Sequence, residues 1–168
     1  MKSIKLTLII AGSAFLLAGA DISKSDQTFA MKAAQGGMAE VQLGQLAVNK
    51  ASSQKVKDFG QKMVKDHSQA NDQLKSIAAK DNISLPSDVS AKDKALMDRL
   101  SGLSGSAFDR AYMNAMLKDH QMDVADFQKE ADSGTNPDLK NFASTTLPTL
   151  KEHLSLAQDT SGSMQASK

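Results

Sequence analysis

The chain contains no cysteine and no tryptophan, and aromatic residues make up only 4% of its 168 residues. The absence of cysteine excludes disulfide bonds and a lipid anchor on a cysteine, so the stability must come from packing. The formal charge is close to zero, +1 at pH 7. Nucleic-acid binding uses a basic surface and stacking groups, and this chain has neither. We therefore expect no nucleic-acid partner.

The first twenty residues have the pattern of an export signal. Lys2 and Lys5 give a basic start, residues 6–17 form a nearly unbroken apolar run, and Ala18-Gly19-Ala20 offers a small-residue cleavage site. The apolar run is shorter than the roughly 20 residues that a membrane-spanning helix needs. We expect a signal peptide over residues 1–20, cleaved after Ala20. The protein would then be periplasmic or otherwise exported, and a loose association with the envelope stays open.

The rest of the chain is rich in Ala, Leu, Lys, Gln and Met, which favour helix. Apolar residues at helical spacing predict four long helices and one short helix. The expected helices run from Asp26 to about Ala51, from Ser52 or Ser53 to about Asp81, from Ser90 to near Gly102, from Ser106 to Gly134, and from Pro137 to about Asp159. We expect one helical domain over residues 21–159, followed by a disordered tail over residues 160–168.

Short polar motifs predict where these helices begin. Asp26 and Ser52 or Ser53 can cap the first two helices, Ser90 with Asp93 and Ser106 with Asp109 have the spacing of capping boxes, and Asn136 can cap a helix that begins at Pro137. The first two helices are joined tightly, as are the last two, and residues 82–105 form a long crossover. The sequence therefore predicts an all-α fold, a ferritin-like antiparallel four-helix bundle with a long crossover containing a short helix.

Each long helix carries one ionisable residue on its apolar stripe. Glu40 lies on the stripe of the first helix, and the only three histidines of the chain, His67, His120 and His153, lie on the stripes of the other three. At a rise of about 1.5 Å per residue, the two residues of each hairpin lie at the same height to within about one helical turn. We expect these four side chains to meet in one layer of the core.

Several neighbours of the histidines allow two interpretations. An acid precedes each histidine, and it could hold an imidazole of a neighbouring helix or, the interpretation we favour, be an ordinary surface residue. Met63 and Met116 lie one turn before a histidine and could be copper ligands, although methionine on such a stripe usually fills the core. Asn71 and Asp123, one turn after a histidine, could orient a ligand or face solvent.

The chain resembles a secreted, ferritin-like bacterial family known as domain of unknown function 4142. The resemblance rests on residues 29–51, on residues 56–79 with the run Phe59-Gly60-Gln61-Lys62-Met63-Val64-Lys65-Asp66-His67, on Phe108-Asp109-Arg110-Ala111-Tyr112-Met113, and on Thr146-Leu147-Pro148-Thr149-Leu150-Lys151-Glu152-His153. It covers nearly all of the chain after the signal peptide. The resemblance implies a fold and an envelope location, and it implies no established activity.

The four stripe residues predict a single metal ion rather than a di-iron centre. A di-iron carboxylate site needs a glutamate three residues before two of its histidines, and this chain has Val64, Leu117 and Leu150 before its three. One carboxylate and three imidazoles suit one Zn, Fe, Mn or Cu ion. Such a protein would serve in metal storage, sequestration or stress protection. The sequence contains neither the catalytic motif of serine hydrolases nor a glycine-rich phosphate-binding loop. Whether the protein is an enzyme stays open.

An alternative interpretation assigns no metal to these residues. In that case Glu40 pairs with one or more imidazoles in a buried polar layer that holds the helices in register. The protein would then be a non-enzymatic helical module that binds the envelope or a partner protein.

Overall fold

The computed structural model describes residues 22–166, which form five helices and no strand. They are α1 (Lys24–Lys50), α2 (Gln54–Asp81), α3 (Ala91–Ser101), α4 (Gly105–Ser133) and α5 (Pro137–Ala166). The all-α prediction is confirmed over this part of the chain. The expected signal peptide lies outside the described residues.

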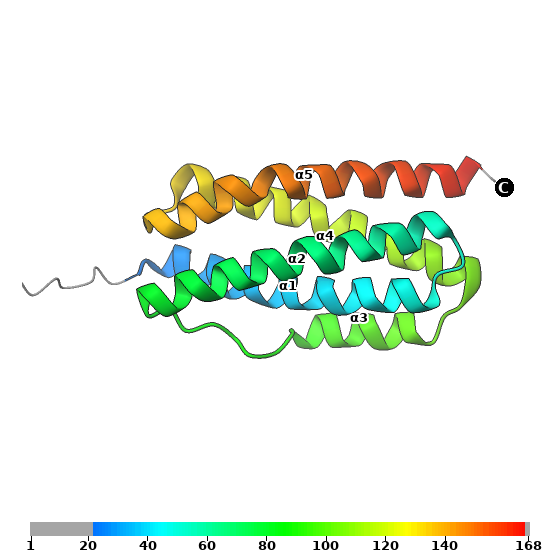
Figure 1. Ribbon diagram of the computed structural model, residues 1–168, viewed down its shortest axis with the longest axis horizontal. Coiled ribbons are helices and arrows are strands. Elements are labelled where there is room, and N and C mark those ends of the chain that lie inside the picture. The colour runs from blue at the N-terminus through cyan, green and yellow to red at the C-terminus, as the bar shows by residue number, and fades with distance from the viewer. Residues whose placement is uncertain (1–21, 167–168) are drawn as a thin grey trace, which may run out of the picture.

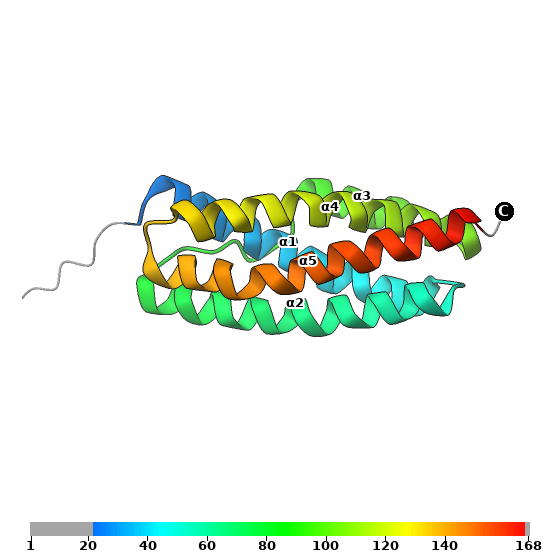
Figure 2. The ribbon, with the colours of Figure 1, turned by 90° about the horizontal axis from the view of Figure 1, so that it is seen from above.

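The four long helices lie side by side as two hairpins (Figure 1). α1 and α2 form one antiparallel pair, and α4 and α5 form the other. The hairpins meet along two further contacts, α2 against α5 and α1 against α4. The short helix α3 lies in the crossover between the hairpins and packs against α1 and α4 (Figures 1 and 2). Each long helix therefore presents one face to the space that all four share.

Several helix ends follow the predicted capping signals. Ser90 caps α3, its hydroxyl accepting a hydrogen bond from the Asp93 backbone N–H at 3.2 Å. Asn136 caps α5 through bonds from the backbone N–H groups of Asp138 and Leu139, at 3.0 and 2.9 Å. Gly134 ends α4. Local hydrogen bonding is enough to define these ends, which is why the sequence predicted them.

Two predicted caps are wrong. α1 is capped by Ser23, whose hydroxyl accepts from the Asp26 backbone N–H at 3.1 Å, and not by Asp26 itself. α4 begins one residue after Ser104, so Ser106 and Asp109 lie inside the helix and form no capping box. In both cases the aspartate is buried. Its carboxylate has a tertiary role that local spacing does not reveal.

Each of these aspartates ties one hairpin to the turn of the other. The Asp26 carboxylate accepts hydrogen bonds from the backbone N–H groups of Thr135 and Asn136, at 3.2 and 2.8 Å, in the α4–α5 turn. The Asp109 carboxylate accepts from the backbone N–H groups of Ser52 and Ser53, at 3.0 and 2.9 Å, in the α1–α2 turn. These charge-assisted bonds satisfy backbone groups at the start of α2 and α5.

The last helix is longer than expected. α5 continues to Ala166, beyond the predicted end near Asp159, and so occupies most of the segment expected to be disordered. Ser161 is buried and Met164 packs against the apolar core. Tertiary packing therefore holds the end of the helix, although its own residues have low helix propensity.

The apolar core is divided into two clusters. One lies toward the α1–α2 turn and is built from residues such as Leu43, Met63, Phe108, Tyr112 and Met116. The other lies toward the α4–α5 turn and is built from residues such as Phe29, Leu74, Phe127, Leu139 and Leu150. Between the two clusters lies a layer of buried polar side chains, so that the middle of the bundle is its polar part.

Candidate metal site

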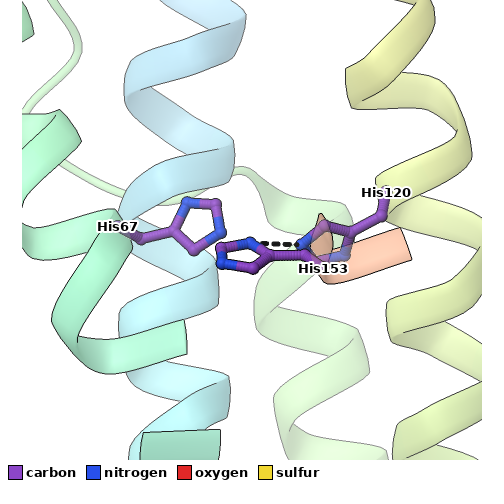
Figure 3. A group of neighbouring side chains, drawn as sticks. All are labelled: His67, His120 and His153. Carbon is purple, nitrogen blue, oxygen red and sulfur yellow. Dashed lines mark hydrogen bonds between the residues drawn. The ribbon is translucent and has the colours of Figure 1, made fainter. Parts of the chain in front are cut away.

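The four residues predicted to meet do so in this layer. Glu40 comes from α1, His67 from α2, His120 from α4 and His153 from α5. Their exposed fractions are 4%, 6%, 0% and 0%, respectively. Figure 3 shows the three imidazoles facing one another across the space between their helices. The structure thus brings together residues from four separate segments.

Apolar neighbours on each helix explain why these polar side chains point inward. Leu43, Met63, Met116 and Leu150, each one turn away from a layer residue, are buried in the adjoining clusters. A helix that buries one of these apolar residues also buries the layer residue one turn away, because positions three and four apart share one face. Hydrophobic packing therefore sets the orientation, and the polar groups must find partners within the layer.

The distances in the layer are those of direct contact. One ring nitrogen from each histidine lies within 4.8 Å of the corresponding nitrogens of the other two. His120 Nε2 lies 3.3 Å from His153 Nδ1 and 3.4 Å from Glu40 Oε1. The other Glu40 oxygen, Oε2, lies 2.9 Å from His67 Nδ1. A single ion could be shared by groups this close together.

Each imidazole is held at one nitrogen by an oxygen atom that accepts a hydrogen bond. His120 Nδ1–H donates to the Met116 carbonyl oxygen at 2.9 Å. His153 Nε2–H donates to Asp66 Oδ2 at 2.9 Å. His67 Nδ1–H donates to Glu40 Oε2 at 2.9 Å. In its neutral form each ring has only one N–H, and its second nitrogen then carries a lone pair.

These lone pairs face the centre of the layer. His120 Nε2 and His153 Nδ1 point at each other, and two lone pairs cannot form a hydrogen bond unless a proton is added to one ring. His67 Nε2 has no hydrogen-bond partner, and neither has Glu40 Oε1. Buried polar atoms without partners cost free energy, of the order of 1–3 kcal/mol each. With the three rings neutral and Glu40 ionised, the layer therefore presents acceptors with no donor between them.

Burial opposes protonation of two of the imidazoles and favours protonation of the Glu40 carboxyl. Burial lowers the pKa of His67 to about 4, and it lowers that of His153 to about 4 although the Asp66 carboxylate opposes the shift. Burial also raises the pKa of Glu40 to about 7, against the attraction of His120. These two imidazoles are therefore neutral at pH 7 and available as ligands.

The acids that precede the histidines differ in their roles. Asp66 holds His153 on the neighbouring helix, so for this residue the interpretation as an orienting acceptor is right and the surface interpretation is wrong. Glu152 is exposed and pairs with Lys62 at 3.1 Å, as a surface acid does. Asp119 is half-buried and lies 3.7 Å from Lys92 of the neighbouring helix α3. All three acids stand at the same spacing from their histidine, so their different roles come from the groups that neighbouring helices place beside them.

The structure also shows the surroundings of the residues that lie one turn from a histidine. Met63 and Met116 are fully buried in the apolar cluster, and Met116 contacts the layer through its backbone carbonyl. Asn71 packs against α1 at Gly37, where a Cβ atom would lie 2.1 Å from Asn71 Oδ1. Asp123 lies near Glu40, and burial together with the charge of that glutamate raises its pKa well above the usual range. Burial likewise raises the pKa of Asp119.

The arrangement defines an all-helical protein with a buried layer of one glutamate and three histidines. The chain belongs to the family described as "Domain of unknown function (DUF4142)", which matches residues 13–160. None of the described helices has the length and apolarity needed to cross a membrane.

Comparison with solved structures shows the same fold in proteins of low sequence identity. A DUF305 fragment from Deinococcus radiodurans is 14% identical, with a TM-score of 0.73, covering 84% of this chain and 97% of that one. CopM in the Cu(II)-bound form is 14% identical, with a TM-score of 0.70, covering 82% and 96%. CopM in the Cu(I)-bound form is 15% identical, with a TM-score of 0.67, covering 80% and 93%. No curated protein matches the chain.

Proposed function

We propose that this protein binds a single transition-metal ion in the middle of its bundle. His67, His120 and His153 supply three nitrogen ligands, and Glu40 supplies an oxygen through Oε1. The observation that carries this proposal is the orientation of the rings. His120 and His153 are fixed from outside by the Met116 carbonyl and by Asp66, and His67 is fixed by Glu40 within the layer. The second nitrogen of each ring is left facing the other rings.

The residues present fit a metal ion on two independent grounds. An ion would give His67 Nε2 and Glu40 Oε1 the partner that each lacks in the protein alone. It would also separate the facing lone pairs of His120 and His153. The outer contacts, Asp66 on His153 and the Met116 carbonyl on His120, are of the kind that metal-binding histidines use to fix their tautomer.

Copper and zinc are the ions that this donor set suits best. Imidazole nitrogens bind both, and a lone carboxylate completes a four-coordinate set. Two of the structurally similar forms are of CopM with Cu(II) and with Cu(I) bound. We therefore propose copper as the ion to test first, with zinc as its competitor, and iron or manganese after them. A di-iron centre has no support, because Val64, Leu117 and Leu150 precede the histidines at the position where it needs a carboxylate.

The proposed biological setting combines the fold with the N-terminal sequence. We propose that the helices form a ferritin-like bundle spanning residues 21–159, extended by the end of α5, and that residues 1–20 direct its export before cleavage after Ala20. In the periplasm or elsewhere in the envelope, a buried single-ion site serves to store or sequester the metal, or to protect against metal stress. The ion is then cargo rather than a cofactor.

The alternative function is a structural layer in a module that binds the envelope or a partner protein. It requires the same four residues to be stable without an ion. That state leaves two buried polar atoms unpaired and two acceptors facing each other, which is why we favour the metal.

Metal stoichiometry tests the proposal. The protein, purified without chelators, is titrated with Cu²⁺, reductant-maintained Cu⁺ and Zn²⁺, and bound metal is measured by mass spectrometry. We expect one ion per chain in the wild type and none in His120→Ala or His67→Gln. Glu130→Gln, which alters a buried acid of α4 outside the layer, should retain the ion. A wild type that binds no ion, with His120→Ala lowering only its melting temperature, would establish the structural layer instead.

A further inference from the structure

Two clefts approach the histidine layer from opposite sides of the bundle. On the α2–α5 side, a cleft of about 270 Å³ is lined by Lys62, Asp66 and Glu152 together with threonines and glutamines. Lys62 Nζ lies 3.0 Å from Asp66 and 3.1 Å from Glu152, so its ammonium group stands over the carboxylate that holds His153. With two carboxylates beside one ammonium group, the formal charge of these three side chains is −1.

The cleft on the opposite side, between α1, α3 and α4, is more strongly acidic. Its volume is about 320 Å³, and its acidic lining residues are Glu40, Asp93, Asp119, Asp123 and Asp126. Only two lysines line it, Lys32 and Lys92, so its formal charge is −3 when all groups are ionised, including Glu40, Asp119 and Asp123, whose pKa values burial raises. Both lysines reach across to carboxylates near the surface, at 3.0 Å to Asp126 and 3.7 Å to Asp119. Asp123 forms no such ion pair within the described part of the chain.

The inner end of this cleft is Glu40. Its side chain is 5% exposed, and its Oε1 atom forms no hydrogen bond but lies 3.4 Å from His120 Nε2. Its Oε2 atom contacts His67. The same carboxylate therefore lines the cleft and belongs to the histidine layer. It connects the solvent side of the cleft with the imidazoles.

The three aspartates of α4 lie on one face of that helix. Asp119, Asp123 and Asp126 are spaced four and three residues apart, so their carboxylates are neighbours along the cleft. Like charges at this spacing destabilise a helix. A cation bound between them would relieve that repulsion, and carboxylate oxygens are ligands that divalent cations accept readily.

We propose that this acidic cleft is the entrance by which a divalent cation reaches the histidines, with the Glu40 carboxylate at its inner end joining the cleft to the histidine site. The inference rests on the proposed function, because the cation passes on to the histidine site. Clefts lined by one sign of charge raise association rates by factors of roughly 10 to 1,000, and salt screens the effect.

The rate of Cu²⁺ binding tests the entrance. The chain has no tryptophan and one tyrosine, Tyr112, which is buried beside the layer and packs on Phe59. Quenching of its fluorescence by Cu²⁺ in a stopped-flow instrument reports arrival of the ion. In Asp93→Asn/Asp126→Asn, which alters two lining residues of this cleft, we expect the association rate at low salt to fall at least tenfold and to lose most of its salt dependence. One ion per chain should still bind.

A matched control removes two carboxylates elsewhere. Asp58→Asn/Asp72→Asn alters two exposed aspartates of α2, which do not line this cleft, and should bind Cu²⁺ at the wild-type rate. Circular dichroism and melting curves establish that both double variants are folded. Equal rates in the two double variants would overturn the entrance while leaving the histidine site intact. Faster binding after Lys62→Gln would place the entrance on the α2–α5 side, and a wild type without bound ion would overturn both proposals.

Discussion

A hydrogen bond from Asp66 fixes the orientation of His153, and it distinguishes this acid from the others that precede a histidine. Burial opposes ionisation of Asp66, but hydrogen bonds from His153 and Lys62 prevail and lower its pKa. Removing an outer acceptor of this kind typically weakens metal binding about 10- to 100-fold. We predict a loss of this size for Asp66→Ala in a competition titration with a copper chelator. Asp66→Asn keeps an acceptor and should lose less.

The control for Asp66 is Glu152→Gln. Glu152 also precedes a histidine and also pairs with Lys62, but its side chain is 58% exposed. Its removal should leave metal affinity unchanged, since it contacts no imidazole. Equal affinities for Asp66→Ala and the wild type would show that His153 is not a ligand held in this way.

Glu130 makes the stability of the protein depend on pH. It is 3% exposed near Asp26, and burial together with the charge of Asp26 raises its pKa to about 7. The folded state therefore favours the protonated carboxyl, whereas the unfolded chain titrates near 4.5. The free energy of unfolding should fall as the pH rises from about 4.5 to 7, and the loss should be complete above pH 7.

Glu130→Gln should remove this part of the pH dependence. We predict that its free energy of unfolding, relative to the wild type, rises by about 1–3 kcal/mol between pH 5 and pH 8. Urea denaturation at the two pH values measures the difference. The exposed Asp132→Asn, on the same helix, should change little. A difference that stays constant from pH 5 to pH 8 would mean that Glu130 is ionised in the folded protein throughout this range.

The sequence predicted the four layer residues because two simple regularities define them. Hydrophobic spacing places each side chain on the buried face, and the constant rise of a helix sets its height. Neither regularity reports which helix faces which. That is why the sequence could not separate Asp66 from Glu152, and why the acidic cleft, which depends on the position of α3, was not foreseen.

Among the elements, the crossing of α1 and α2 depends on a pair of glycines. A Cβ atom at Gly60 would lie 2.8 Å from the Gly44 carbonyl oxygen and 2.9 Å from the Ala47 Cβ. The obstructing atoms belong to the backbone and to a short side chain, so they cannot move aside cheaply. We predict that Gly60→Ala destabilises the protein by about 1–3 kcal/mol, measured by urea denaturation.

Gly36→Ala is the matched control within α1. A Cβ atom at Gly36 would meet nothing within 4 Å, so the substitution should change stability only through the higher helix propensity of alanine. The variant should be more stable than the wild type by up to about 1 kcal/mol. If Gly60→Ala were stabilising as well, the close approach of the two helices would not be a requirement of the fold.

The helix ends show which caps can be predicted from the local sequence and which cannot. Ser90 and Asn136 were predicted as caps because their partners lie two or three residues away. Asp26 and Asp109 were misassigned because their partners lie in the turns of the opposite hairpin. Similarly, the end of α5 depends on packing of Met164 against the core, which propensity alone does not describe.

In the molecule as a whole, the polar layer separates two apolar clusters. All four long helices cross this layer, so an ion bound to it would link both hairpins at mid-height. Each helix contributes one layer residue, and no pair of neighbouring segments could form the site alone. The fold therefore supplies the site by its overall packing rather than by a local motif.

The X-ray absorption spectrum of the protein loaded with one equivalent of copper observes the ligands directly. Three histidines around one ion predict strong scattering from about three imidazole nitrogens per copper, with a weaker oxygen contribution that disappears in Glu40→Gln. Sulfur scattering from methionine, or a signal from a single imidazole, would show that His67, His120 and His153 do not share an ion.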